Sequence, residues 1–483
     1  MSASNMDTGT DPAGEMSTPV RFCAWGWPAA ARPTETMPLQ RRKSTQRERL
    51  LAGMVDVTNR RGYAGASVSS VIARAKVSRP TFYEYFADRD DCFTATIEEV
   101  GVELLAGVAQ AIEARPAQEA MTSAVVALLN YANANGARAR FLMGESMAGG
   151  ASALDARDRG VAQIASAIER AQRKAPADAS LPDLEPRVLV GSVYRMIATR
   201  LRRWETEVSK LTDDLLAWVA AYERPAGELR WRTLAPGPMS SRSPHVPDAP
   251  IQQMPGLLPP GRVWLSEPQV MENHRLRILY AVARLAEQKG YTASTVEDIM
   301  RLARIDPNSF YRLFANKQEA FAAAHELGFQ QVMDVTVKAF FAGHGWPQRS
   351  WEAGRALSQL LDANPLVANV GFVEAYAIGP GAVQRIEDSH TAFMFFLQDG
   401  LVHEPQANPP SRTAMEAIVA GVFEIIYMQV RKRKPQIAAM LAHIAHLWLT
   451  PFMGIEEADA FIDGQMRDAQ HEAQPRRTRS GRR

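Results

Sequence analysis

One segment of this chain occurs twice, 228 residues apart. The two copies align without a gap between Arg47 and Phe93 of the first. The shared residues include Gly62-Tyr63 with Gly290-Tyr291, Ser67-Val68 with Thr295-Val296, Phe82-Tyr83 with Phe310-Tyr311, and Phe86-Ala87 with Phe314-Ala315. The match continues more faintly at an offset of 229. A period this long indicates a duplicated domain rather than a solenoid, whose repeats run roughly 20–50 residues.

The composition is that of a globular protein, with 46% apolar and 22% charged residues. A chain of 483 residues is too long for one ordinary core and predicts two to four domains. Cys23 and Cys92 are too few for a disulfide framework or a four-ligand zinc site. The longest apolar runs fall short of the roughly 18 residues that span a bilayer, and Met1–Glu15 lacks the apolar core of a signal peptide. We expect a cytoplasmic protein with no membrane partner.

The repeated unit predicts short helices joined by tight turns. In the first copy Ser67 can cap one helix and Ser78 the next, with Pro80 in the first turn, where proline costs little. In the second copy Thr295 to Asp298 resembles a capping box, and Asp306 is a cap followed by proline. Two short helices joined in this way form a helix-turn-helix, whose second helix fits the major groove of DNA. The remainder is amphipathic and rich in Ala and Leu, so the predicted fold class is all-α.

Positive charge is concentrated in these units. Residues 41–91 hold 11 basic and 6 acidic side chains, a net charge of +5, and residues 272–319 hold 8 and 6, a net charge of +2. The whole chain carries only +2, so the rest is net acidic. Local positive charge on a helix-turn-helix is the pattern expected for phosphate binding.

These motifs together resemble the TetR (tetracycline-repressor) family of bacterial transcriptional regulators. The resemblance rests on Val77 to Phe86 (VSRPTFYEYF) with Asp88-Arg89, on Ser309 to Phe314 (SFYRLF) with Asn316-Lys317, and on the shared pairs given above. It implies two units, each a three-helix DNA-binding domain followed by a helical ligand-binding and dimerisation domain. The expected divisions are 1–40, a disordered extension; 41–95, the first DNA-binding domain; 96–224, the first regulatory domain; 225–268, a Pro-rich linker; 269–323, the second DNA-binding domain; 324–463, the second regulatory domain; and 464–483, a basic disordered tail.

The resemblance also implies the roles of individual residues. Phe82, Phe86, Phe310 and Phe314 are expected in the core. Phosphate contacts are expected from Ser67, Tyr83, Arg89, Thr295, Tyr311 and Lys317, and base-edge contacts from Arg79, Pro80, Thr81, Pro307, Asn308 and Ser309.

The chain departs from the family pattern in the turn and in the second recognition helix. Lys76 and Arg304 stand where glycine is usual, and a left-handed conformation there costs each roughly 1–2 kcal/mol. The second recognition helix begins with the acidic Asp306. We therefore expect the second head to bind DNA more weakly or to read a different half-site.

Other polar residues have two interpretations. Glu145 and Glu374, matched across the copies, could line a ligand pocket or make a structural ion pair. His443 and His446, with Glu424 on the preceding helix, could bind a metal but are more often satisfied interior groups. No triad, phosphate loop or dinucleotide fingerprint supports catalysis. We predict no enzyme activity, no metal and no cofactor.

The family resemblance implies pairing through the last two helices of each unit. The candidates are about Arg187–Arg203 with Leu211–Tyr222, and about Thr413–Lys432 with Gln436–Leu449. We predict that the two copies pair within one chain as a pseudo-dimer; the alternative is a homodimer with two ordinary interfaces. The predicted function is a repressor that binds a double-stranded operator with two unlike half-sites and responds to a small apolar effector. The alternative is a ligand-sensing or scaffold protein in which only the first head binds DNA.

Overall fold

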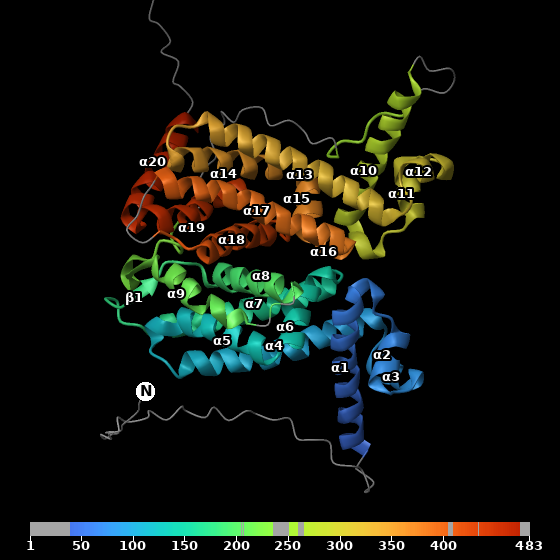
Figure 1. Cartoon of the computed structure of the whole chain (residues 1–483), viewed down its shortest axis with the longest axis horizontal. Coiled ribbons are helices and arrows are strands. Elements are labelled where there is room, and N and C mark those ends of the chain that lie inside the picture. The colour runs from blue at the N-terminus through green and yellow to red at the C-terminus, as the bar shows by residue number, and fades with distance from the viewer. Residues whose placement is uncertain are drawn as a thin grey trace, which may run out of the picture. The chain divides into compact units, whose positions relative to one another are not determined.

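The structure is a computed structural model, in which residues 39–203, 205, 207–234, 251–258, 265–403, 409–432 and 434–473 are described (Figure 1). These residues are almost entirely helical, which confirms the predicted all-α class. The extension predicted over residues 1–40 lies outside the described residues, except where the first helix begins at Leu39.

The first copy begins with a head of three helices, α1 to α3, and continues with a helical bundle. A short antiparallel pairing, β1 (Ser180–Pro182) with β2 (Glu223–Pro225), joins two of its loops. The helices are α1 (Leu39–Gly65), α2 (Val68–Ala75), α3 (Arg79–Tyr85), α4 (Arg89–Glu113), α5 (Ala120–Ala134), α6 (Gly136–Ala139), α7 (Ala151–Gln172), α8 (Pro186–Arg202) and α9 (Thr212–Ala220).

The second copy repeats this order. Its helices are α10 (Glu267–Ala293), α11 (Val296–Ala303), α12 (Pro307–Leu313), α13 (Lys317–Ala342), α14 (Trp346–Ala363), α15 (Pro365–Asn369), α16 (Ala375–Ile378), α17 (Pro380–His403), α18 (Arg412–Val430), α19 (Leu441–Met453) and α20 (Ile455–Ala473). The helix pairs predicted for dimerisation correspond to α8 with α9 and α18 with α19. α8 packs along α18, so the regulatory bundles of the two copies share one hydrophobic core (Figure 1).

Both copies contain one π-helical turn at matching places. The turns are η2 (Arg140–Gly144) and η6 (Val370–Glu374). Such turns widen the helix and recur at functional sites in proteins. Glu145 directly follows η2, and Glu374 is the last residue of η6.

Two expected segment boundaries differ from the structure. Ile251, in the middle of the predicted linker, is fully buried, and the Gln252 side chain accepts a hydrogen bond from the Leu366 backbone N–H at 3.2 Å. The linker therefore includes a segment that packs on the second copy. α20 continues ten residues past 463, where the tail was expected to begin, because buried Ala458 and Ile462 give it an apolar face. Residues 474–483 lie outside the described residues.

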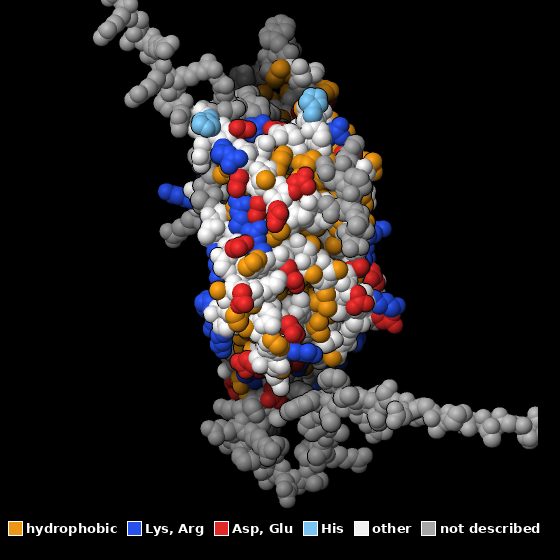
Figure 2. All heavy atoms as spheres, turned by 90° about the vertical axis from the view of Figure 1, so that its left-hand side faces the viewer, with side chains coloured by type: hydrophobic (Ala, Val, Ile, Leu, Met, Phe, Trp, Pro, Cys, Tyr) orange, Lys and Arg blue, Asp and Glu red, His pale blue; other side chains and the backbone are white. Residues whose placement is uncertain are grey.

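α18 is the one described helix that is long and apolar enough to cross a membrane. Its burial accounts for that composition, since 78% of its apolar window is buried inside the protein. Figure 2 looks onto the side formed by β1, α19 and α20, where acidic and basic side chains are intermixed. Among the described residues of that face neither charge sign predominates.

Candidate nucleic-acid interface

The first head is a helix-turn-helix built by its caps. The Ser67 hydroxyl accepts a hydrogen bond from the Ser70 N–H at 3.2 Å, and the Ser70 hydroxyl accepts one from the Ser67 N–H at 2.9 Å, which completes a capping box at α2. Ser78 caps α3 in the same manner through the Thr81 N–H, with Pro80 in the first turn. The predicted caps of this head are confirmed.

The second head uses different residues for the same geometry. Thr295 and Asp298 form the predicted capping box at α11, with Asp in place of the usual Glu or Gln. Asp306 caps α12 through the Ser309 N–H at 3.0 Å, and its other carboxylate oxygen accepts from the Ser309 hydroxyl at 2.6 Å. These bonds lower the pKa of Asp306, with the Ser309 hydroxyl contributing most. The start of this recognition helix therefore carries a negative charge.

The turn of each head holds a basic residue in a left-handed conformation. Lys76 has φ 52° and ψ 50°, and Arg304 has φ 53° and ψ 54°, and both side chains are exposed. They are the positive-φ residues other than glycine in the described part of the chain. The expected strain is thus present twice, at equivalent positions next to the recognition helix. Strain that persists beside a binding surface suggests that the side chain is used there.

The aromatic residues of the recognition helices divide into core and surface. Phe82 and Phe310 are fully buried, as predicted. Tyr83 and Tyr311 are 48% and 57% exposed, and each packs edge-on against the buried phenylalanine beside it. The tyrosine rings are thereby held in place while their surfaces stay open to a ligand.

The predicted base-contacting residues form exposed first turns. In α3, Arg79 and Pro80 are exposed and Thr81 is half-buried; in α12, Pro307 and Asn308 are exposed and Ser309 is half-buried. The Arg79 guanidinium lies 5.8 Å from the centre of the Tyr83 ring, a distance at which cation–π attraction helps to orient it. The two faces therefore match in exposure but differ in charge.

Arg89 and Lys317, the phosphate contacts predicted at the starts of α4 and α13, are half-buried and hydrogen-bonded within their own heads. Lys317 Nζ donates to the carbonyl oxygens of Tyr291, Thr292 and Ser294 at 3.0, 3.4 and 2.8 Å, which occupies its three donors. Arg89 donates to the Tyr63 hydroxyl at 3.0 Å and to the Ala66 carbonyl at 3.4 Å, and both cations lie 4.4 Å from a tyrosine ring centre. They stabilise the end of the first helix of each head.

Glu145 and Glu374 connect each regulatory bundle to its head. Glu374 accepts a hydrogen bond from the Tyr291 N–H at 2.7 Å, and Glu145 accepts one from the Tyr63 backbone. Gly62 and Gly290, which precede these tyrosines, kink α1 and α10 at φ 70° and 81°, a conformation that favours glycine. Burial raises the pKa of both glutamates, and the hydrogen bond lowers it. Of the two interpretations, a structural role fits, with the backbone of the head as the partner.

Two adjoining apolar cavities of about 50 and 30 Å³ lie in the second regulatory bundle. Phe372, Phe393 and Phe423 line both of them. Two buried polar atoms in their walls lack a hydrogen-bond partner, namely Ser350 Oγ and His325 Nδ1. Burial lowers the pKa of His325 to about 4, so its ring is neutral near pH 7. The lining is apolar with a few polar groups, as in small-molecule sites, but the two cavities are far smaller than the roughly 300 Å³ or more of a pocket that already accommodates a drug-sized ligand.

The histidines considered for a metal site have protein partners. His446 Nε2 lies 2.9 Å from the carbonyl oxygen of Asp183, and its Nδ1 lies 3.4 Å from the Thr450 hydroxyl. Glu424 lies elsewhere, in an ion-pair cluster with Arg157 and Arg195. Among the described residues no group of three or more His, Cys, Asp or Glu side chains could hold a metal ion.

Each copy therefore carries a capped helix-turn-helix with an exposed second helix, which is the geometry of a DNA-binding domain. The model for bacterial regulatory proteins of the tetR family matches residues 50–96 and 278–324, which is one head in each copy. The chain thus contains the DNA-binding domain of the tetR family of bacterial regulatory proteins twice, once in each copy. One solved structure similar to it is a TetR family transcription regulator from Marinobacter aquaeolei VT8, with 18% identity, a TM-score of 0.31 and coverage of 39% of this chain and 97% of that chain.

Proposed function

We propose that this protein represses transcription by binding one operator with both heads. The observation that carries the proposal is the pair of exposed first turns, Arg79 to Thr81 and Pro307 to Ser309, each on a capped recognition helix. Phosphate contacts come from the Tyr83 and Tyr311 hydroxyls and from Ser67 and Thr295 at the starts of α2 and α11. Because the two first turns differ in sequence and charge, the operator contains two unlike half-sites.

The two copies pair within one chain. Two equivalent ion pairs between the copies support this arrangement: Arg202 Nε to Glu387 at 3.1 Å, and Arg431 Nε to Asp158 at 3.4 Å. Joining both heads in one body makes the second binding event intramolecular, which raises affinity when the heads match two successive major grooves. Light scattering should give the 53.3 kDa mass of one chain. A dominant species of twice that mass would contradict pairing within the chain.

A small apolar effector with one or two hydrogen-bonding groups controls binding. The support is the cavity pair, whose wall includes Phe372 in the π-helical turn η6, two residues before Glu374. An effector that displaces Phe372 would move Glu374 and, through its bond to the Tyr291 N–H, the second head. A change in the separation of the heads would then release the operator.

In-vitro selection of bound DNA tests the proposal. The intact protein should select two unlike half-sites at a constant spacing, and Phe372→Trp, which fills the cavity, should alter the effector response without altering the selected sequence. A protein that selects no DNA sequence would refute the function.

A second candidate is a regulator in which only the first head binds DNA and the second copy senses the ligand. It is favoured by the negative charge of Asp306 at the start of the second recognition helix, where the first head has the neutral cap Ser78. Asn308→Ala separates the two candidates, because under this one it leaves DNA affinity unchanged.

A further inference from the structure

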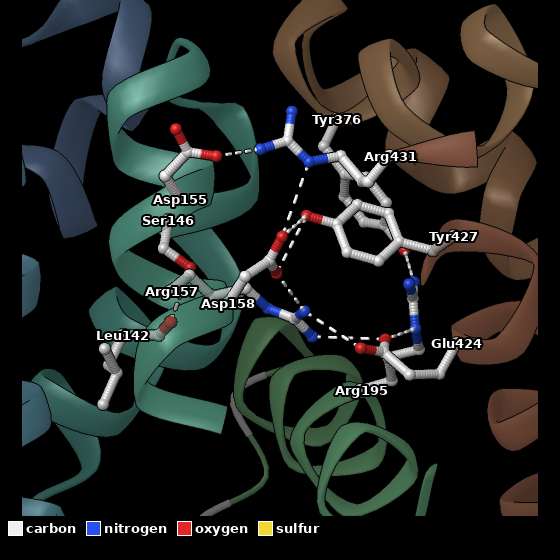
Figure 3. Close-up of polar contacts among 10 residues, drawn as sticks. All are labelled: Leu142, Ser146, Asp155, Arg157, Asp158, Arg195, Tyr376, Glu424, Tyr427 and Arg431. Atoms are coloured by element: carbon white, nitrogen blue, oxygen red, sulfur yellow. Dashed lines mark hydrogen bonds and ion pairs between the residues drawn. The ribbon is translucent and has the colours of Figure 1, made fainter. Parts of the chain in front are cut away.

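The interface between the copies contains opposite charges at equivalent positions. At the offset of 229, Arg195 of α8 corresponds to Glu424 of α18. These two residues contact each other: Arg195 Nε donates to Glu424 Oε2 at 3.0 Å. Both side chains are buried, at 7% and 0% exposure (Figure 3). Equivalent residues that meet in this way lie beside the pseudo-twofold axis that relates the copies.

The ion pairs farther from this axis do not discriminate between partners. Asp158 with Arg431 and Glu387 with Arg202 are equivalent pairs, because Asp158 corresponds to Glu387 and Arg202 to Arg431. Two first copies brought together by the same symmetry would form the Asp158–Arg202 pair twice. Two second copies would form the Glu387–Arg431 pair twice. These flanking charges favour pairing in general.

The charges beside the axis, on Arg157, Arg195 and Glu424, favour pairing of a first copy with a second copy over pairing of two like copies. Glu424 also accepts two hydrogen bonds from Arg157, at 3.0 and 3.3 Å, and position 157 corresponds to Ile386 in the second copy. A pair of first copies would bury four guanidinium groups, from Arg157 and Arg195, without the Glu424 carboxylate. Arg157 would keep Asp158 of its own copy, but the two Arg195 groups would have no counter-charge in place of Glu424. A pair of second copies would bury two Glu424 carboxylates without an arginine at either position. Buried like charges without a counter-charge are strongly unfavourable.

The ion pair between Arg200 and Glu416 also depends on which copies meet. Arg200 Nη2 contacts Glu416 Oε2 at 2.5 Å across the interface. Glu416 corresponds to Arg187 of the first copy. In a pair of first copies Arg200 would therefore face an arginine in place of a glutamate.

Shape adds to the discrimination. Glu424 lies against Gly191, where an added Cβ would be 2.3 Å from Glu424 Cγ. The equivalent of Gly191 in the second copy is Ala420, which carries that Cβ. A pair of second copies would thus bring each glutamate against an alanine methyl group as well as against the other glutamate.

We infer that the buried charges of this interface allow a first copy to pair only with a second copy and exclude pairing of two first or two second copies. We call this arrangement of Arg157, Arg195, Arg200, Glu416 and Glu424 the charge code. It combines attraction between the correct faces with repulsion between the wrong ones. The inference deepens the proposed pairing of the two copies and rests on it. Its consequence is that every assembled pair carries one head of each kind.

Charge reversal in the full-length chain tests the code. Arg195→Glu places a carboxylate against Glu424, and Glu424→Arg places a guanidinium against Arg157 and Arg195. Each variant alone loses its central ion pair. When the two variants are combined, the first copy of one chain can pair with the second copy of the other, and both resulting interfaces are complementary.

The experiment is co-expression of two chains with different affinity tags. The charge code predicts that a chain with Arg195→Glu and a chain with Glu424→Arg co-purify as a dimer of about 107 kDa, twice the 53.3 kDa of one chain. Two Arg195→Glu chains with different tags should not co-purify, and the single variants should lose most of their soluble yield when expressed alone. Equal co-purification of two Arg195→Glu chains, or none between the complementary variants while each alone stays a monomer, would overturn the inference.

A crosslink distinguishes this inference from the proposed function. Arg200→Cys with Glu416→Cys in a Cys23→Ser background should join positions 200 and 416 through a short bis-maleimide. A bond within one chain agrees with both proposals. A 200–416 bond between chains keeps the charge code and contradicts pairing within one chain, while a 200–200 bond contradicts the code. None of these outcomes depends on DNA binding.

Discussion

Replacing Glu424 by glutamine should destabilise the protein by about 3–5 kcal/mol, the usual cost of removing one partner from a buried ion pair. The side chain is fully buried and accepts three hydrogen bonds from two arginines at 3.0–3.3 Å. Glutamine keeps the shape but removes the negative charge, and its amide N–H groups then face other donors. Arg157 retains Asp158 at 3.0 Å, while Arg195 retains only the Tyr376 hydroxyl at 2.8 Å among its described partners.

The matched control is Glu98→Gln, which breaks the exposed pair with Arg159 and should cost less than about 1 kcal/mol. Urea unfolding, followed by circular dichroism and tryptophan fluorescence, measures both variants. An m-value of at least about 3 kcal/mol/M for a chain of this size gives a fall in the midpoint of at most about 1–1.7 M urea for the Glu424 variant. A midpoint within the range of the control would refute the idea that this carboxylate holds the interface together.

Glu424 also predicts that the stability of the protein depends on pH. Burial raises the pKa of Glu424, but Arg157 and Arg195 outweigh burial and hold the pKa at about 2, below its usual value of 4.5. A carboxylate whose pKa is depressed by folding stabilises the protein above its unfolded pKa, and this contribution is lost as the pH falls through the folded value. The wild-type protein should therefore lose this stabilisation between about pH 4.5 and pH 2, and the Glu424→Gln variant should not.

Three further predictions concern the heads. Lys76→Gly and Arg304→Gly should each raise the free energy of unfolding by up to about 1 kcal/mol, because glycine adopts the left-handed conformation without strain. Both variants should also bind DNA more weakly, as measured by fluorescence anisotropy. Unchanged binding would show that these two side chains make no contact with DNA. Arg79→Ala should relax base preference in the first half-site at a cost of about 1–3 kcal/mol, and Asn308→Ala should do so in the second; a uniform loss across DNA sequences would instead assign them to phosphate. Glu374→Ala should speed hydrogen exchange at Tyr291 about tenfold or more, because a charge-assisted hydrogen bond is worth about 1.5–3 kcal/mol; unaltered exchange would exclude the coupling role.

The heads were predictable from sequence because their signals are local. The caps Ser78 and Asp306, and the basic residues Lys76 and Arg304 in the turns, each act within four residues of their own position. The family resemblance placed Phe82 in the core, and Phe82 is fully buried. Such features depend on backbone geometry that neighbouring residues determine.

Contacts between distant segments were not predictable in the same way. Lys317 matches the position of a family phosphate contact, yet tertiary packing turns it toward carbonyls at the end of α10. The role of Glu374 depends on a backbone N–H 83 residues away in the chain. One long-range signal was present but unused: at the offset of 229 an arginine, Arg195, stands opposite Glu424, which is the sign of a complementary rather than a self-matching interface.

The most direct test of the central claim is selection of bound DNA by the intact protein and by the Arg79→Ala and Asn308→Ala variants. Two unlike heads in one body predict an operator with two different half-sites, with centres about 10 base pairs or a multiple apart. Each variant should lose base preference in one half-site only. A perfect palindrome, in which both half-sites respond to the same variant, would contradict the account.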